Sequence, residues 1–204
     1  MMLARTEWAQ WAATITQSSH RTRSGCSAMP EAYVLVGSNI DPEHNIPTAL
    51  RMLAERVRVC AISTFYRTEP LSSPGAPPFL NGAVRIETDM EPRELKFGVL
   101  REIESALGRT RGPDRYAPRT IDLDIALHGS LIISEPDLEI PDPDIAARSF
   151  VAIPLAELAP ELVLPGHEIT LAEVAARLGT DDMTSLEDFT RTLRSELTSE
   201  QAEN

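Results

Sequence analysis

Residues 121–127, Ile-Asp-Leu-Asp-Ile-Ala-Leu, decide the fold that the sequence predicts. Apolar side chains alternate there with Asp122, Asp124 and Ala126, which is the pattern of a β-strand with one face in the core. Residues two apart on a strand point to the same side, so Asp122 and Asp124 project together while Leu123 enters the core. The sequence therefore predicts a sheet that carries a pair of carboxylates on one face.

Strand and helix patterns alternate along the chain before this strand. Apolar runs rich in β-branched residues predict strands, and apolar residues three and four positions apart predict helices. The predicted elements are strand 32–36, helix 45–57, strand 59–65, strand 79–88 and helix 92–107. With the strand at 121–127, this β-α-β-β-α-β order predicts an α+β fold with a ferredoxin-like core. We expect a C-terminal annex to follow, with a loop and a strand over 132–159 and a short helix over 171–178.

The two ends of the chain differ from this core. Residues 1–28 contain the polar run 17–25 and are expected to form a flexible N-terminal extension, with Met29 as an alternative start of translation. We assign residues 29–180 to the folded domain. Residues 181–204 are expected to be a helical or frayed tail, with fraying from Ser195 onward.

Composition narrows the class of protein. The 204 residues include 31 acidic and 19 basic ones, which gives a formal net charge of −12, and Lys96 is the single lysine. Nucleic acid would be repelled by such a surface. No apolar run approaches the roughly 18 residues of a membrane span. The distant Cys26 and Cys60 fit neither a disulfide framework nor a metal site. We therefore expect a cytoplasmic protein without nucleic-acid or membrane partners, and as its oligomeric state a monomer, with an oligomer as the alternative.

The loop before the decisive strand is rich in arginine. Four arginines precede the two aspartates: Arg109, Arg111, Arg115 and Arg119. Convergent carboxylates bind hard cations such as Mg²⁺, whose other ligands are waters and substrate phosphates, and one pair can serve two ions. Arginine binds phosphate oxygens through two N–H groups and stays charged. These residues predict a site for Mg²⁺ and a polyphosphate. The alternative interpretation is a solvated strand face with adjacent ion pairs. This interpretation is the weaker one, because aspartate is disfavoured in strands.

Other common catalytic motifs are missing from the sequence. It contains neither a Walker-type phosphate loop nor a glycine-rich dinucleotide motif. The four histidines have no ligand spacing, and no serine or cysteine has the surroundings of a nucleophile. Phe79 and Asn81 lie two apart on a predicted strand and so point to the same face. They could bind one planar heterocycle together, or Phe79 could pack in the core while the Asn81 amide is hydrogen-bonded within the protein. The residues alone leave these two alternatives open.

Several further motifs occur in a fixed order between about residues 32 and 165. They are Gly37-Ser38-Asn39, residues 63–71 (STFYRTEPL), Phe79-Leu80-Asn81, Ile103-Glu104, Leu107-Gly108-Arg109, residues 118–125 (PRTIDLDI), Pro141, Arg148-Ser149-Phe150 and Pro154-Leu155. Together they resemble the 6-hydroxymethyl-7,8-dihydropterin pyrophosphokinases of folate biosynthesis. The resemblance implies a ferredoxin-like fold and transfer of the β,γ-diphosphoryl group of ATP to the pterin hydroxymethyl group. It also implies release of AMP and a need for two Mg²⁺ ions.

The resemblance implies a role for each matching residue. Asp122 and Asp124 would bind the ions, while Arg109 and Arg119 would lie over the transferring phosphates as catalytic residues from a mobile loop. The residues near ATP would be Glu104, Arg111, Arg115, Tyr116, Arg119, Ile125 and Arg148. The pterin ring would lie between Phe79 and Phe150, and its edge would contact Asn81, Thr68 and Leu71.

Two positions depart from the family pattern. Many members have, after the proline that matches Pro141, a histidine that reaches an ATP phosphate, whereas this chain has Asp142. Because an acid would repel polyphosphate, we expect either that Asp142 turns away or that ATP binds more weakly than usual. Tyr116 replaces a frequent tryptophan and keeps a stacking ring. The alternative function is a catalytically weakened homologue that still binds pterin or nucleotide. An RNA-binding module and a metal-dependent nucleotide hydrolase are the further rivals.

Overall fold

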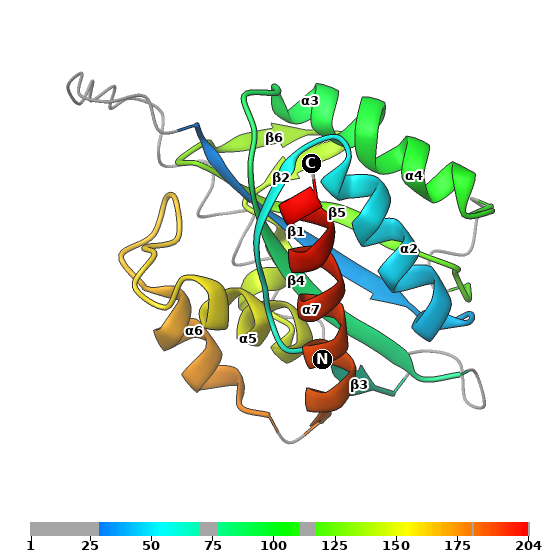
Figure 1. The fold of residues 1–204 in the computed structure, drawn as a ribbon. Coiled ribbons are helices and arrows are strands. Elements are labelled where there is room, and N and C mark those ends of the chain that lie inside the picture. The colour runs from blue at the N-terminus through cyan, green and yellow to red at the C-terminus, as the bar shows by residue number, and fades with distance from the viewer. Residues whose placement is uncertain (1–28, 70–76, 111–116, 181, 204) are drawn as a thin grey trace.

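The structure is a computed structural model that describes residues 29–69, 77–110, 117–180 and 182–203. Within these residues, a six-stranded antiparallel sheet has β5, β1, β4, β3 and β8 side by side in that order, and β2 also pairs with β4 (Figure 1). The strands are β1 (Glu31–Ser38), β2 (Arg58–Ile62), β3 (Tyr66–Thr68), β4 (Phe79–Glu87), β5 (Asp122–His128) and β8 (Met183–Ser185). A separate two-stranded sheet pairs β6 (Ile133–Glu135) with β7 (Leu138–Ile140).

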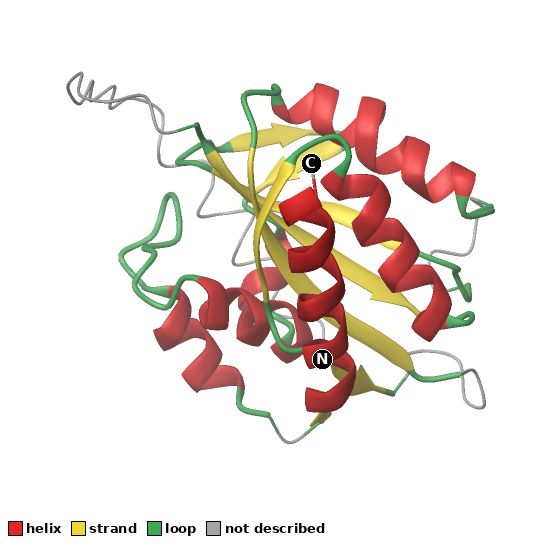
Figure 2. Ribbon diagram, viewed as in Figure 1, coloured by secondary structure: helices red, strands yellow, loops and turns green. Residues whose placement is uncertain are grey.

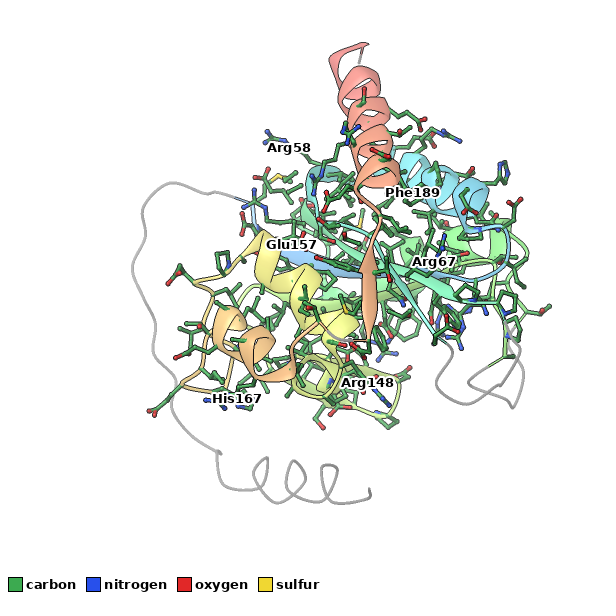
Figure 3. All side chains as sticks on the ribbon, turned by 90° about the horizontal axis from the view of Figure 1, so that it is seen from below. Arg58, Arg67, Arg148, Glu157, His167 and Phe189 are labelled. Atoms are coloured by element: carbon green, nitrogen blue, oxygen red, sulfur yellow. The ribbon has the colours of Figure 1, made fainter. Side chains whose placement is uncertain are left out.

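Helices cover both faces of the large sheet (Figures 2 and 3). One face carries α2 (Pro42–Ala54), α3 (Pro92–Glu94), η1 (Leu95–Leu100), α4 (Arg101–Ala106) and α7 (Glu187–Glu203). The opposite face carries η2 (Pro143–Ala146), α5 (Ser149–Leu158) and α6 (Leu171–Leu178). Each helical layer has its own apolar core against the sheet. None of the helices in the described ranges has the length and apolarity that a membrane span needs.

The strand register gathers the predicted site residues on one face of the sheet. Gly37 of β1 lies opposite Asn81 of β4 and, on its other side, opposite Asp122 of β5. Leu35, two residues earlier, lies opposite Asp124. Directly opposed residues of antiparallel strands share a face. The carboxylate pair and Asn81 therefore lie on the face that also carries α5.

Most predicted elements are present, with shifted ends. The helix expected over 45–57 begins three residues earlier, at Pro42, and the helix over 171–178 has the predicted bounds. The strand expected over 59–65 ends at Ile62 as β2, because Ser63 bonds to Ala83 through both its backbone N–H and its hydroxyl oxygen where the chain leaves the ladder. Strand β3, from Tyr66 to Thr68, was not predicted. The helix expected over 92–107 is continuous but contains the π-helical segment η1.

The interpretation of residues 132–159 as a loop and a strand was wrong for its last third. Residues Ser149–Leu158 form helix α5, half of whose residues are buried. A helix that is apolar on nearly every side has no amphipathic period in its sequence. Pro154, inside the helix, also reads as a helix breaker. Both effects hid α5 from the pattern analysis.

The segment expected to be a tail packs onto the sheet in the described residues. Strand β8 pairs with β3, with Tyr66 opposite Ser185. Helix α7 continues past Ser195, and Leu193 and Leu197 are buried in the core that it shares with α2 and α4. The segment thus takes the helical alternative over Glu187–Glu203, and Leu186, Phe189, Leu193 and Leu197 belong to the core or pack against it. The extension predicted for residues 1–28 lies outside the described residues.

Candidate active site

Asp122, at the start of β5, binds two arginines at once. Its Oδ1 accepts a hydrogen bond from Arg109 and its Oδ2 accepts one from Arg119. Burial alone would raise the pKa of Asp122, but the two guanidinium groups outweigh it and hold the pKa below its usual value. The structure thus brings together three of the four residues that the resemblance assigns to the metal ions and the transferring phosphates.

Glu104 is the second carboxylate that holds Arg109. Only 2% of its side chain is exposed, and that of Arg109 is 11% exposed. Glu104 Oε1 accepts hydrogen bonds from Arg109 and, at 2.9 Å, from the backbone N–H of Leu123. In this conformation Glu104 faces Arg109 and β5. Any effect of Glu104 on ATP is therefore exerted by positioning Arg109.

Asp124, the second carboxylate of β5, has a lysine as its partner. Lys96 Nζ lies 2.9 Å from Asp124 Oδ1, and the backbone N–H of Ile125 donates to the same oxygen at 2.9 Å. Sequence analysis gave Lys96 no role, because a lysine on a predicted helix is usually a solvated residue. The next side chain, Ile125, is buried in the core, so only its backbone is available to a nucleotide.

Ser38 and Asn39 hold the chain that carries Arg119. Ser38 Oγ donates to the Thr120 carbonyl at 2.6 Å, and Asn39 Oδ1 accepts from the Arg119 N–H at 2.7 Å. The Asn39 N–H also donates to the Arg119 carbonyl at 3.2 Å, and its side-chain amide donates to the Pro77 carbonyl at 3.3 Å. Sequence analysis named Gly37-Ser38-Asn39 as a motif of the resemblance but assigned it no role. The buried polar pair Ser38 and Asn39 is therefore a positioning feature that pattern analysis missed.

The residues expected to contact the pterin lie beside the carboxylates. Asn81 donates to Thr68 Oγ1 at 2.8 Å, and the guanidinium carbon of Arg119 lies 5.8 Å from the centre of the Phe79 ring. A Cβ at Gly37 would come within 2.7 Å of Asn81 Oδ1, so only glycine leaves the present space over this part of β1. These contacts join the predicted pterin side of the site to its phosphate side.

The first turn of α5 provides the remaining predicted contacts. Phe150 is half-buried and packs against the core of the α5 face. Arg148 precedes the helix, and its Nε lies 3.9 Å from Asp144 Oδ1 (Figure 3). No contact between Phe150 and Phe79 is formed among the described residues. Leu71, Arg111, Arg115 and Tyr116 lie outside the described residues.

Asp142, which replaces the family's histidine, is turned toward its own backbone. It caps η2, since its Oδ1 accepts from the Asp144 N–H at 2.7 Å. The pKa of Asp142 is raised to about 7, chiefly by burial and also by the negative charges of Asp124 and Asp144, against the opposing effects of the Asp144 N–H and Lys96. This geometry agrees with the first expectation, that Asp142 turns away, and the carboxyl group is not a full negative charge at neutral pH.

The carboxylates fit a cation that arrives with its own ligands. Among the described residues, no cluster of three or more His, Cys, Asp or Glu side chains can hold a metal ion. Mg²⁺ is commonly held by one or two carboxylates together with substrate phosphates and waters. The closest contact of Lys96 and the bond from the Ile125 N–H are both at Asp124 Oδ1, and within the described part of the chain no hydrogen bond reaches Oδ2. A two-carboxylate donor set with an open oxygen therefore suits Mg²⁺ bound with a polyphosphate.

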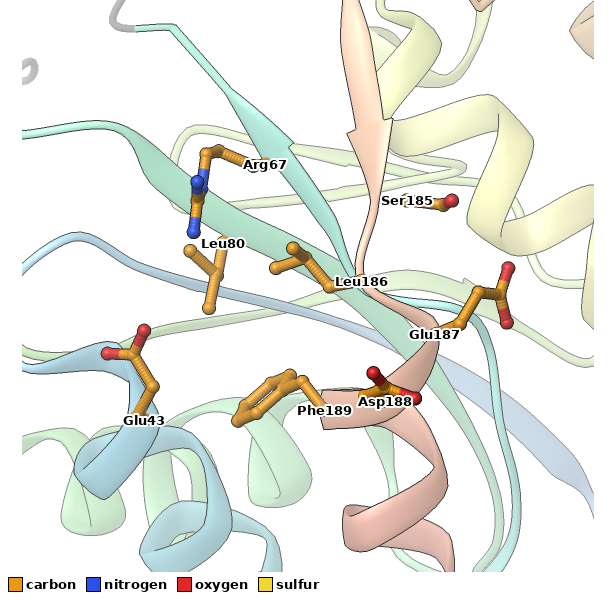
Figure 4. A pocket seen from close by; sticks show the side chains of 8 residues that line it. All are labelled: Glu43, Arg67, Leu80, Ser185, Leu186, Glu187, Asp188 and Phe189. Atoms are coloured by element: carbon orange, nitrogen blue, oxygen red, sulfur yellow. The ribbon is translucent and has the colours of Figure 1, made fainter.

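A cavity of about 450 Å³ lies on the other face of the sheet (Figure 4). Arg67 and Leu80 line it, and strand alternation points both away from the face of Thr68 and Phe79. Its acidic lining residues are Glu43, Glu187 and Asp188. Three carboxylates against one arginine would repel the phosphates of ATP. This cavity is therefore separate from the candidate active site.

Comparison with known proteins identifies the family. Residues 33–160 match the family described as 7,8-dihydro-6-hydroxymethylpterin-pyrophosphokinase (HPPK). The chain belongs to this family. Two relatives named 2-amino-4-hydroxy-6-hydroxymethyldihydropteridine pyrophosphokinase agree with that assignment. The one from Haemophilus influenzae is 38% identical over 144 residues, which cover 69% of this chain and 89% of the relative. The one from Methylorubrum extorquens is 40% identical over 153 residues, which cover 74% of this chain and 94% of the relative.

Solved structures of the HPPK family share the fold. The Plasmodium falciparum HPPK-DHPS wild type with SDX-DHP has a TM-score of 0.59 at 12% identity, and the match covers 76% of this chain. The match covers 47% of that chain, so the present chain spans about half its length. At this identity the likeness concerns the fold alone. The resemblance to the pyrophosphokinases and the mixed fold with an antiparallel sheet are thus confirmed.

Proposed function

We propose that this HPPK family member transfers the β,γ-diphosphoryl group of ATP to 6-hydroxymethyl-7,8-dihydropterin. The pterin hydroxymethyl oxygen forms a bond to the β-phosphorus, the bond from the β-phosphorus to the α–β bridging oxygen breaks, and that oxygen leaves with AMP. The observation that carries the proposal is the pair of carboxylates on one face of β5, with Arg109 and Arg119 on Asp122. The names of the relatives support the same reaction, and nothing in the comparisons supports a catalytically weakened homologue.

Arg109 and Arg119 act on the phosphates in this proposal. Asp122 holds both guanidinium groups, so they are close together before any substrate binds. Positive groups that are already positioned stabilise charge that develops in the transition state without a cost of reorganisation. Glu104, Ser38 and Asn39 keep the two arginines in place through the contacts described above. Arg148 lies at the same face and is proposed to contact the nucleotide.

Asp122 and Asp124 would hold Mg²⁺, and we propose two ions. The metal would supply neutralisation of the ATP phosphates and orientation of the β-phosphorus. No hydrogen bond reaches Asp124 Oδ2 among the described residues. In this proposal Arg109 and Arg119 would leave Asp122 for the phosphates when ATP binds. The freed Asp122 carboxylate would then be a metal ligand.

The pterin is proposed to bind over Gly37, against Phe79 and Asn81. Asn81 offers an amide to the edge of a planar heterocycle, and Phe79 offers an aromatic face. Phe150 at the start of α5 supplies the opposite apolar wall. The Asn81 amide already donates to Thr68 at 2.8 Å, which fixes its orientation and supports a role in recognition.

The experiment that tests the function is AMP release from MgATP with and without the pterin. We expect AMP and the pterin diphosphate, detected by mass, to form in equal amounts and only when both substrates are present. Asp124→Asn should remove the activity, since one metal ligand loses its charge. Pterin-independent release of inorganic phosphate would instead identify a nucleotide hydrolase. Pterin binding without AMP would identify a homologue that only binds.

We also propose that the core is ferredoxin-like. The helix and strand order β1, α2, β2 with β3, β4, α3 to α4, β5 supports this assignment, with β2 and β3 together in the place of one strand. The lateral order β5, β1, β4 and then β2 or β3 supports it as well.

A further inference from the structure

Strand β8 borders the strand that carries Thr68, one of the proposed pterin contacts. It begins at Met183, beyond the residues 33–160 that match the family, and it pairs with β3 on the side away from β4. Thr68 of β3 thus lies opposite Phe79 on one side and opposite Met183 on the other. The position of Thr68 therefore depends on β8 as well as on β4.

Helix α7, which follows β8, binds the chain that leads into β3 (Figure 3). The backbone N–H of Leu186 donates to the Phe65 carbonyl at 2.8 Å, and the Phe65 N–H donates to Thr190 Oγ1 at 2.9 Å. Arg194 donates to the Ile62 carbonyl through two nitrogens, at 2.7 and 2.9 Å. The Thr190 side chain is fully buried. These bonds make β8 a fixed part of the sheet.

The residue before β8 contacts the first turn of α5. Asp182 accepts a hydrogen bond from the Ser149 hydroxyl, whose Oγ lies 2.7 Å from Oδ1 and 2.9 Å from Oδ2. Ser149 is buried and is the first residue of α5, between Arg148 and Phe150. A hydrogen bond to a charged acceptor is stronger than one between neutral groups. One carboxylate thus joins the turn that carries Phe150 to the strand beside Thr68.

We infer that Asp182 is a positioning residue that sets the place of Phe150 relative to Thr68, and so the fit of the pterin ring between them. The inference rests on the proposed function, in which Phe150 is one wall of the pterin site and Thr68 borders the edge of the ring. Asp182 is exposed and acts through Ser149 rather than on a substrate.

The nucleotide side of the same turn has a separate support. Arg148, on the other side of Ser149, donates its backbone N–H to the Asp144 carbonyl at 2.9 Å, and its side chain lies 3.9 Å from the Asp144 carboxylate. Loss of Asp182 leaves these contacts in place. We therefore expect the pterin, and not ATP, to bind more weakly when Asp182 is replaced.

A fluorescence titration with 6-hydroxymethyl-7,8-dihydropterin tests the inference on the whole chain. The protein is first saturated with Mg²⁺ and α,β-methylene-ATP, which lacks the bond that the reaction breaks. In Asp182→Ala the pterin affinity should fall about tenfold, the population shift that one hydrogen bond to a charged group produces. The affinity for the ATP analogue, measured by calorimetry without pterin, should not change. Asp182→Asn, which keeps an acceptor oxygen for Ser149, should retain most of the pterin affinity.

A double-mutant cycle shows whether Asp182 acts through Ser149. Asp182→Ala, Ser149→Ala and the double variant should all lose the same pterin affinity, because all three lack the same bond. Losses that add in the double variant would overturn the inference, since Asp182 would then act independently of α5. A lower stability of Asp182→Ala in urea with unchanged pterin affinity would overturn it too, because the bond would then serve only the fold.

Asp188→Ala is the matched control. It removes a carboxylate from the same C-terminal segment, where Asp188 is 92% exposed and pairs with Arg191 at 2.8 Å. We expect it to leave the affinities for the pterin and for the ATP analogue unchanged. A loss of pterin affinity as large as that in Asp182→Ala would show that the charge of the segment decides, and would overturn the inference.

The outcomes also separate this inference from the proposed function. Absence of pterin binding by the wild-type protein with the ATP analogue would overturn the pterin site and this inference together. Pterin binding that Asn81→Ala weakens but Asp182→Ala leaves unchanged would overturn only the role of Asp182.

Discussion

Replacement of Glu104 by glutamine tests whether this buried carboxylate holds Arg109 in the active site. Glu104 is 2% exposed, contacts Arg109 and accepts the Leu123 N–H at 2.9 Å. The amide oxygen of glutamine keeps the bond from Leu123, so the variant removes the charge and little else. Arg109 then retains only Asp122 as a partner among the carboxylates described here.

The size of the effect follows from these contacts. A hydrogen bond to a charged group contributes about 1.5 to 3 kcal/mol, and Glu104→Gln weakens one such bond to a side chain that is 11% exposed. We expect the free energy of unfolding to fall by about 2 kcal/mol. The rate of AMP formation should fall about tenfold or more, because Arg109 is no longer confined to one position and small displacements of catalytic groups are costly.

Urea unfolding and the AMP assay measure the two effects. Glu102→Gln is the matched control, since Glu102 lies two residues away with a side chain 60% exposed and an ion pair to Arg56 at 3.4 Å. Exposed pairs contribute about 0.2 to 1 kcal/mol, so this control should change little. Equal losses of stability in the two variants, or full activity of Glu104→Gln, would refute the assigned role of Glu104.

Three further predictions follow from other parts of the structure. Gly37→Ala should weaken pterin binding at least tenfold in a fluorescence titration, while ATP binding changes less. The reason is that the new Cβ would lie 2.7 Å from Asn81 Oδ1 and displace that amide. Unchanged pterin affinity would contradict the proposed place of the pterin ring over Gly37. Asp142→Asn keeps the cap but removes a carboxyl group whose pKa is raised from 3.8 to about 7. Because the folded protein holds this proton more tightly than the unfolded chain, the wild type loses stability as the pH rises from about 4 to about 7. The variant should therefore gain up to about 4 kcal/mol relative to wild type at pH 8 compared with pH 4, measured by urea unfolding at both pH values; the same pH dependence in both proteins would show that Asp142 ionises normally. Leu193→Ala should lower the free energy of unfolding by about 3 kcal/mol, because Leu193 is 1% exposed. A loss below about 0.5 kcal/mol would mean that α7 does not pack on the core at Leu193.

The active-site strand could be predicted from sequence because its signal is local. A period of two over residues 121–127 determines the face of Asp122 and Asp124 whatever surrounds the strand. Arg109 and Arg119 lie in the adjacent loop, and their charge indicated what they bind. The structure places both of them on Asp122, as the sequence analysis expects of residues that share one site.

The supporting residues could not be predicted, because their roles depend on contacts distant in sequence. Lys96 lies in a π-helical turn of the helix that packs on β5. A search for apolar residues three and four positions apart cannot detect the one extra residue in such a turn. Asn39 reads as a turn residue until the chain around Arg119, 80 positions later, folds against it. Glu104 lies on a helix where most acids face solvent. Its burial follows from the packing of α4 on β5.

The contacts of Asn39 have a consequence for the dynamics of the site. One buried side chain donates to the Pro77 carbonyl and accepts from the Arg119 N–H, so the backbone on the pterin side and the backbone on the phosphate side are joined through a single amide. Each segment can separate from Asn39 only by breaking its bond to the same side-chain amide. In native-state hydrogen exchange the backbone N–H groups of Phe79, the first that follows Pro77 and Pro78, and of Arg119 should open as one cooperative unit, with one free energy of opening.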